Sequence, residues 1–377
     1  MSESLSIALL VHHQLVPGAG APGSTTSLAA ALRERGHRVD VVGLEIAGTD
    51  ERLLTHLRFP FAAARRMRRA LRNHTYDVID ASTGDLWLLT RAEIARSSTV
   101  VVTRSHGLEP LGVLARRNGV RRQELTLRRR YGIYHGGWRL HEVRRTLRCA
   151  DAVLVLNERE RDYVASLGVD RDAIIRTAPL AGVAFADTPD AQFSSSVAVL
   201  GGTQWRKGGS DNAGFIVDLL RTHDRATVTW VGASPSDVTS AIPSDLQLRV
   251  RSLTNYQPEE AANVFRSHAV VVLLSRFEGL PVTVLEAMSH GCVVVGTAIG
   301  GLEELVEHSG GSCAVGDVAG AVKAVVAALE ESTWRELSAR TVESVAKFAP
   351  SRIVDLLVEN YQRAVAHKAL PGSSGTR

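Results

Sequence analysis

Short apolar runs alternate with longer stretches of helical periodicity along almost the whole chain. Strand-like runs lie at 6–11, 37–43, 78–80, 99–103, 151–157, 197–200, 227–232, 246–250, 270–274 and 292–295. Amphipathic or alanine-rich stretches lie at about 26–35, 52–73, 86–96, 158–167, 258–266, 281–290, 319–329 and 353–367. Regular alternation of buried strands with helices predicts an α/β fold built on doubly wound parallel sheets.

The pattern is interrupted once by a polar, proline-bearing segment at 188–196, T-P-D-A-Q-F-S-S-S. A chain of 377 residues is long for one domain and comfortable for two. We therefore predict an amino-terminal domain at 1–190 and a second domain at 191–351, joined by this linker.

The stretch 275–291, S-R-F-E-G-L-P-V-T-V-L-E-A-M-S-H-G, carries the strongest chemical signal. It follows a buried strand, and Pro281 and Gly291 suit the first turn and the end of a helix. Glu278 then lies in the loop at the carboxyl end of the strand, with Glu286 about a turn and a half into the helix. Ligands bind at that edge of an open α/β sheet, and helix amino termini attract phosphate. The alternative is that both glutamates are solvated surface charges.

Two glycine-rich loops resemble phosphate-binding turns. Residues 12–25 form a long loop with the spacing G-x-G-x-x-G at Gly18, Gly20 and Gly23, after the first strand. In the second half, V-A-V-L-G-G-T-Q-W-R-K-G-G leads through Arg206 and Lys207 into a helix from about residue 211. Cations beside a helix start suit a diphosphate. A plain tight turn and a pair of surface cations are the alternatives.

His106 lies in R-S-H-G-L-E-P, directly after the all-β-branched strand 99–103. This position is again the ligand edge of a parallel sheet. A lone histidine is compatible with a structural role as well, so its position alone does not assign a function.

The order E-G-L-P, V-L-E-A-M and H-G-C-V-V-V-G-T-A-I-G-G-L-E-E-L-V resembles the donor-site signature of the retaining GT-B glycosyltransferases of the family 4 type, glycosyl transferases group 1. The resemblance covers nearly the whole chain. It implies two Rossmann-like doubly wound domains facing across a cleft, with the last helix, 352–368, packing back on the first domain. It also implies hexosyl transfer from a nucleotide-diphosphate sugar to an acceptor hydroxyl with retention, in bacterial polysaccharide, glycolipid or glycoconjugate biosynthesis.

The resemblance further implies a role for each matching residue. Glu278 holds the sugar hydroxyls and Glu286 holds the ribose, with support from the amides of Gly279 and Leu280. Lys207 neutralises the departing diphosphate, and His106 orients the sugar. Gly20 lies in the loop near the diphosphate, and Tyr256 lies near the base.

The chain departs from the family where an arginine is common, because that position is Gly202. Our hypothesis is that Arg206 substitutes for it. We expect no general base, no metal and no cofactor, since the nucleotide sugar is a co-substrate and the acceptor proton can pass to the leaving phosphate. Two other functions stay open: a phosphorylase on the same fold, and a non-catalytic binder of sugar nucleotide or anionic membrane.

The net charge of +4 hides a strong asymmetry. Residues 1–190 contain 28 arginines, no lysine and 21 acidic residues, and between Arg58 and Arg148 there are 20 arginines against 7 acidic residues. Such a region suits an anionic partner, either a membrane surface or an anionic acceptor, unless it is simply a solvated surface. No recognition motif or aromatic–basic interleaving points to nucleic acid.

Compartment is predicted from cysteines and from the first residues. Cys149, Cys292 and Cys313 are odd in number and widely spaced, which indicates neither a disulfide framework nor a metal site. Residues 1–10 lack the basic start of a signal peptide, and no apolar run reaches the ~20 residues that a membrane helix needs. We expect a cytoplasmic protein, with peripheral contact at the inner face of the membrane as an extension.

Overall fold

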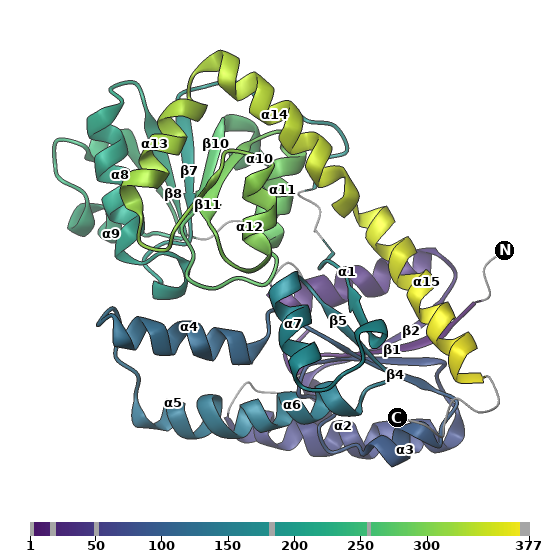
Figure 1. Ribbon diagram of the computed structural model, residues 1–377. Coiled ribbons are helices and arrows are strands. Elements are labelled where there is room, and N and C mark those ends of the chain that lie inside the picture. The colour runs from purple at the N-terminus through teal and green to yellow at the C-terminus, as the bar shows by residue number, and fades with distance from the viewer. Residues whose placement is uncertain (1–3, 16–19, 49–52, 181–184, 255–257, 370–377) are drawn as a thin grey trace. The chain divides into compact units, whose positions relative to one another are not determined.

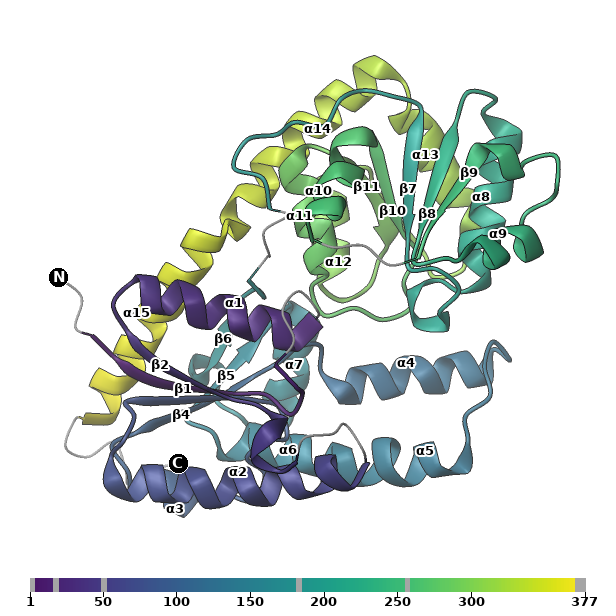
Figure 2. The same cartoon turned by 180° about the vertical axis from the view of Figure 1, so that it is seen from behind.

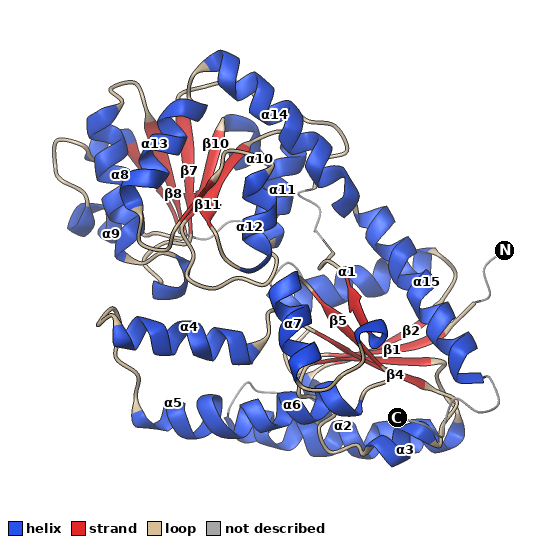
Figure 3. Ribbon diagram, viewed as in Figure 1, coloured by secondary structure: helices blue, strands red, loops and turns tan. Residues whose placement is uncertain are grey.

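The computed structural model describes residues 4–15, 20–48, 53–180, 185–254 and 258–369. Contacts divide the chain into two units (Figure 1). The first comprises Met1–Leu180 and Pro350–Arg377, and the second comprises Ala181–Ala349. Each unit is an α/β structure built on a parallel sheet (Figure 3), so the predicted fold class is confirmed.

The described part of the first unit contains a six-stranded sheet in the order β2-β1-β3-β4-β5-β6. All of its strand pairs are parallel. The strands are β1 (Ser6–Leu10), β2 (Arg38–Val42), β3 (Val78–Ser82), β4 (Val100–Arg104), β5 (Ala152–Val155) and β6 (Ile174–Arg176). Strands β3, β4 and β5 are buried at every position, as parallel strands covered on both faces must be.

Helices cover both faces of this sheet, with α1 and α15 on one side and α2 and α3 on the other (Figures 1 and 2). Their bounds are α1 (Gly20–Glu34), α2 (Leu53–Asn73), α3 (Arg91–Ala95), α4 (Glu109–Arg121), α5 (Arg129–Ile133), α6 (Arg139–Cys149), α7 (Glu158–Ser166) and α15 (Pro350–Ala369). A π-helical turn, Tyr134–Trp138, joins α5 to α6. The core under α2 includes Phe59, Met67 and Ile94, which pack on Leu10 and Ile79 of the sheet.

The last described helix, α15, is tied to the first unit by buried polar contacts. Tyr361 is 1% exposed, and its hydroxyl donates to Asp80 and accepts from Arg104 at 3.0 Å. Arg104 also forms an ion pair with Asp80. A third link runs from Lys368 Nζ to Asp151.

The described part of the second unit contains a six-stranded parallel sheet in the order β12-β11-β10-β7-β8-β9. The strands are β7 (Ser196–Leu200), β8 (Thr227–Val231), β9 (Val250–Leu253), β10 (Val270–Leu273), β11 (Val293–Thr297) and β12 (Ser312–Cys313). The helices are α8 (Ser210–Thr222), α9 (Pro235–Ala241), α10 (Pro258–Ser267), α11 (Val282–His290), α12 (Gly300–Glu307), α13 (Val318–Ala328) and α14 (Glu331–Val345).

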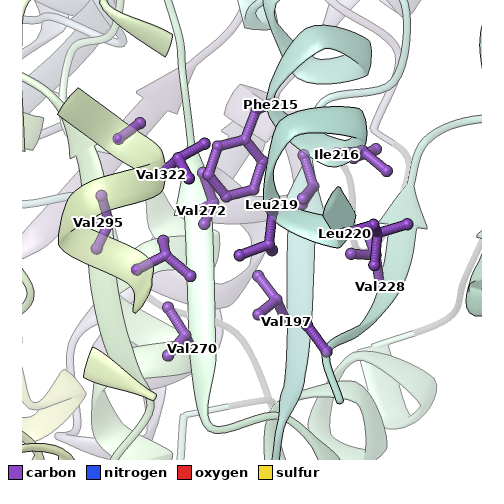
Figure 4. Packing of buried hydrophobic residues seen from close by; sticks show 14 of the residues in the cluster. Val197, Phe215, Ile216, Leu219, Leu220, Val228, Val270, Val272, Val295 and Val322 are labelled. Atoms are coloured by element: carbon purple, nitrogen blue, oxygen red, sulfur yellow. The ribbon is translucent and has the colours of Figure 1, made fainter. Parts of the chain in front are cut away.

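Aliphatic side chains from α8 and α13 fill one face of the second sheet (Figure 4). Phe215 and Leu219 of α8 are fully buried against Val197 and Val272 of the strands. The wide use of valine suits parallel strands, because β-branched residues pack well on a pleated surface. This core fixes the strand ends from which the site is built.

Four local predictions were wrong. Helix α1 begins at Gly20 and not near residue 26, because Thr25 and Thr26 donate to carbonyls of its own first turns and do not cap its start. Helix α3 begins only at Arg91, where Thr90 forms a capping box with Glu93. The run 246–250 is mostly a 3₁₀ turn, Gln247–Arg249, with a fully exposed Leu248. Pro281 is the residue before α11 and not part of its first turn. Strands β6 and β12 and helices α4, α5, α9 and α14 were not predicted.

Candidate active site

The second unit has a topological switch point between β7 and β10. The chain runs from β7 outward through β8 and β9, then returns to the other side of β7 and runs outward through β10, β11 and β12. The loops that follow β7 and β10 therefore leave the sheet in opposite directions. In doubly wound folds the crevice between two such loops binds the ligand.

Glu278, in the loop after β10, is the centre of this edge. Its side chain is only 6% exposed, yet three polar groups meet it. Lys207 Nζ lies 2.5 Å from Oε1, Ser275 Oγ donates to the same oxygen at 2.7 Å, and Arg206 Nη1 lies 3.7 Å from Oε2. The contact between Lys207 and Glu278 therefore bridges the two loops of the switch point.

The two cations are presented by a short 3₁₀ turn, Trp205–Lys207, which Arg276 holds in place. The Arg276 side chain, 6% exposed, donates to the carbonyls of Trp205 and Gly208 and pairs with Asp211 at 2.9 Å. Its guanidinium also lies over the Trp205 ring, 5.5 Å from the centroid. The Arg276 side chain is engaged in these contacts with the turn. Arg206 and Lys207 are the cations that lie beside Glu278.

Gly202 explains why the family's arginine is missing from its usual position. Its φ is +56°, and a Cβ there would lie 2.2 Å from the carbonyl oxygen of Gly232. The Gly202 carbonyl also accepts from the buried Asn212 amide at 2.8 Å, as does the Lys207 carbonyl at 2.9 Å. A side chain at residue 202 would clash with backbone, so the positive charge comes from further along the loop.

The loop Glu278–Leu280 is fixed from the other side by the start of α12. The Gly301 amide donates to the Gly279 carbonyl at 2.7 Å, and a Cβ at Gly300 would lie 2.1 Å from the Glu278 carbonyl oxygen. Glu286 lies in the middle of α11 and is 7% exposed. Backbone amides at the start of such a helix lack intrahelical acceptors and suit an anion.

The first unit has the corresponding switch point between β1 and β3. His12 follows β1 and Asp85 follows β3, and His12 Nδ1 lies 2.7 Å from Asp85 Oδ1. Burial lowers the pKa of His12 to about 3, with the Arg139 cation acting in the same direction. Burial raises the pKa of Asp85 to about 8, against the opposing effect of Arg139. Both shifts favour the uncharged form of their group.

Arg139, at the start of α6, organises the surroundings of this pair. Its guanidinium donates to the Thr83 carbonyl at 2.7 Å and pairs with Glu109 at 2.9 Å and Glu142 at 3.2 Å. A Cβ at Gly84, whose φ is +85°, would lie 2.4 Å from this guanidinium. The cation is thus held by a buried network and stabilises the turn after β3.

His106 follows β4 at the same edge of the first sheet. Burial, with Arg104 as the next cause, lowers its pKa to about 3, so its imidazole is neutral. Its Nε2 is buried, and none of the described residues bonds to it. A neutral histidine with one ring nitrogen uncommitted within the described structure can donate to or accept from a hydroxyl.

The structure brings some of the predicted residues together. Lys207, Arg206 and Glu278 meet at the switch point of the second unit, with Gly279 and Leu280 next in the chain and Glu286 in the following helix. Gly20, as the first residue of α1, and His106 belong to the first unit. Tyr256 lies outside the described residues.

Sequence reasoning missed the residues that support the site. Ser275 and Arg276 stand within the motif that carried the resemblance, so their proximity to Glu278 was visible, but their partners were not. Asp85 and Arg139 are far apart in sequence and carry no motif. Only the strand order places Asp85 at the switch point, and no pattern of spacing predicts that.

The described residues contain neither a membrane-spanning helix nor a multi-residue metal site. No helix within the described residues combines the length and the apolar composition that crossing a bilayer requires. The same residues contain no group of three or more histidine, cysteine or acidic side chains placed to hold a metal ion.

Two protein families match the chain, one in each half. The family described as "Glycosyltransferase Family 4" matches residues 19–177, and that described as "Glycosyl transferases group 1" matches residues 197–331. Among characterised proteins, N-acetyl-α-D-glucosaminyl L-malate synthase of Bacillus anthracis is 30% identical over 134 residues. That match spans 34% of this chain and only 35% of the relative's own length.

Solved structures of low sequence identity share the fold over nearly the whole chain. Sucrose-phosphate synthase from Thermosynechococcus elongatus has a TM-score of 0.71 at 19% identity, covering 96% of this chain and 99% of its own. HepE of Anabaena, solved in complex with UDP and glucose, has a TM-score of 0.65 at 14% identity, covering 95% and 99%. Identities this low establish shared architecture and leave substrates undetermined.

Proposed function

Because the chain belongs to the GT-B glycosyltransferases, we propose that it transfers a sugar from a nucleotide-diphosphate sugar to an acceptor hydroxyl with retention of anomeric configuration. The donor binds at the switch point of the second unit. We also propose that the acceptor belongs to bacterial polysaccharide, glycolipid or glycoconjugate biosynthesis; the partial match to the bacterial N-acetyl-α-D-glucosaminyl L-malate synthase supports a glycosyltransferase in general.

The contact between Lys207 and Glu278 is the observation that carries this proposal. A diphosphate sugar has an anionic end and a hydroxyl-rich end, and the two loops offer a cation and a carboxylate 2.5 Å apart. Lys207 has three donors and Glu278 has about four acceptor positions, so each can keep this contact and still bind substrate. We assign Lys207 and Arg206 to the diphosphate and Glu278 to the sugar hydroxyls.

The rate enhancement then comes mainly from electrostatic stabilisation of the departing nucleoside diphosphate. Fixed cations and backbone amides aimed at developing charge are commonly the largest contribution to catalysis. We assign Lys207 and Arg206 to this role, and Glu286 to the ribose hydroxyls, with the amides of Gly279 and Leu280 supporting the two glutamates in donor binding. The acceptor proton passes to the leaving phosphate oxygen, so the proposal includes no general base and no cofactor or metal ion.

In the first unit we assign His106 to orientation of the transferred sugar. Its neutral imidazole, with Nε2 bonded to none of the described residues, suits a hydroxyl better than a phosphate. Gly20 is proposed to let the start of α1 approach the diphosphate closely, because glycine leaves the backbone amides unobstructed. We also propose that the protein acts in the cytoplasm.

A thermal-shift panel tests the donor assignment directly. UDP-, GDP-, ADP- and TDP-sugars are added to the full chain at about 100 times their dissociation constants, where binding stabilises by about 2.7 kcal/mol. We expect one nucleotide class to raise the melting temperature, and Lys207→Met to abolish that shift while leaving the unliganded melting temperature within about 3 °C. Equal shifts in the variant would place the donor elsewhere, and phosphate-dependent turnover without nucleotide would indicate a phosphorylase.

A further inference from the structure

Helix α2 of the first unit has apolar side chains on two faces. One face packs into the core through Phe59, Ala63 and Met67, all fully buried. On another face, near the start of the helix, Leu54 is 56% exposed and Phe61 is 63% exposed. Large apolar side chains gathered on one exposed stripe are unusual in a helix whose core contacts are already made.

The same exposed side of α2 continues as a row of arginines. The helix contains six arginines and no acidic residue. Arg68 is committed to Glu93 at 2.7 Å, whereas Arg58, Arg65 and Arg69 are exposed and form no hydrogen bond or ion pair with any described residue. An unneutralised row of this kind keeps its full attraction for an external anion.

We propose that this surface, the α2 face (Leu54, Leu57, Arg58, Phe61, Arg65 and Arg69), docks on a bilayer that contains anionic lipid. At helical spacing these residues recur every three or four positions and so share one side. The stripe is about 22 Å long, from 15 steps of about 1.5 Å. Leucine and phenylalanine enter the headgroup–acyl boundary while the arginines bind anionic headgroups.

The apolar half of the α2 face distinguishes a bilayer from other anionic partners. A soluble polyanion or free phosphate would gain from the arginines and nothing from Leu57 or Phe61. A bilayer gains from both, because it offers charge and an apolar interior at adjacent depths. The proposal concerns only where the protein resides, so it stands or falls independently of the glycosyl-transfer chemistry.

Vesicle sedimentation of the full chain tests the proposal. Vesicles of phosphatidylcholine with about one third phosphatidylglycerol are compared with phosphatidylcholine alone, at two salt concentrations. We expect salt-sensitive binding to the anionic vesicles only. Leu57→Ser/Phe61→Ser is expected to weaken binding about tenfold, and Arg65→Gln/Arg69→Gln about 25-fold, from about fivefold per arginine.

Matched controls come from the second unit, where Leu248 is fully exposed and Arg225 is exposed. Leu248→Ser and Arg225→Gln should each leave binding within about twofold, and all variants should keep the parent melting temperature, since the changed side chains make no core contacts. Absence of sedimentation would overturn the proposal. So would an arginine effect without an apolar effect, because a purely electrostatic contact does not distinguish a bilayer from a soluble polyanion.

Discussion

Replacing Glu278 by alanine is the sharpest test of the proposed chemistry. The substitution removes the acceptor for Lys207 at 2.5 Å and for Ser275 at 2.7 Å, together with the more distant charge partner of Arg206. In the reaction it removes the carboxylate assigned to the sugar hydroxyls. Loss of one well-placed charged contact costs about 3 kcal/mol of transition-state stabilisation, or about 150-fold in rate.

The effect on folding should be much smaller. Lys207 is 22% exposed, so once unpaired it can turn to water, and the loss of free energy of unfolding should be about 1 kcal/mol. Glu278→Gln separates charge from hydrogen bonding, because its amide oxygen can still accept from Ser275. We expect this variant to lose most of the activity as well, with an unchanged melting temperature.

The assay follows release of nucleoside diphosphate from whichever donor sugar raises the melting temperature. Glu331→Ala is the matched control, because Glu331 also forms an ion pair, with Arg335 at 2.6 Å, but on the exposed side of α14. A Glu278→Ala variant that keeps more than about a tenth of the parent rate would refute the assignment, since that loss is under about 1.4 kcal/mol. A fall in melting temperature above about 10 °C would instead make Glu278 a structural residue.

Three further predictions concern the glycine loop, the neutral histidines and the core. Gly202→Arg restores the family's arginine but should abolish donor binding in the thermal-shift assay and lower the melting temperature. The φ of residue 202 is +56°, and a Cβ there would clash with the carbonyl oxygen of Gly232. Restored or improved donor binding would contradict this prediction. Stability should be greatest near pH 6.5 and fall as the pH drops towards 3, because unfolding lets His12 and His106 take up protons, each contributing up to about 1.4 kcal/mol per pH unit, against the opposing contribution of the single group Asp85. Between about pH 6.5 and 8 stability should fall as the pH rises, because Asp85 keeps its proton in the folded state and loses it on unfolding. A double His→Gln variant should remove the fall below pH 6.5 in urea titrations at several pH values. Leu219→Ala should lower the free energy of unfolding in urea by about 2–5 kcal/mol without changing donor affinity; a loss under about 1 kcal/mol would mean that this core is loosely packed.

Much of the fold follows from the hydrophobic pattern because both sheets are parallel and buried. The run 270–274 is apolar at every position, and 99–103 is β-branched at every position with an apolar centre, as expected for strands covered on both faces. The failures share a different cause. Whether Thr25 caps a helix or lies within it, and whether Leu248 lies in a strand or a turn, depends on the balance of local hydrogen bonds and tertiary packing. The sequence alone does not decide that balance.

Some residues of the candidate site could likewise be predicted from the sequence, and others could not. Glu278 and Lys207 could be predicted, because each stands in a motif at a strand end. Arg276, which holds the 3₁₀ turn, and Asp85, which pairs with His12, could not, because their partners are set by strand order. From the sequence, Gly202 marks only a missing arginine, whereas its backbone conformation shows that the loop has no room for one.

The return of the chain to the first unit through α15 has a consequence for synthesis on the ribosome. Residues 181–349 are contiguous, so the second unit can fold as soon as they emerge. The first unit begins earlier but is completed later, because Asp80 and Arg104 have to wait for Tyr361. Tyr361 lies 281 residues after Asp80 in the chain. Until then, a buried ion pair and the sheet face beneath α15 stay open to solvent and to other chains. The first unit is therefore synthesised first but completes its folding last, and chaperones should act on it.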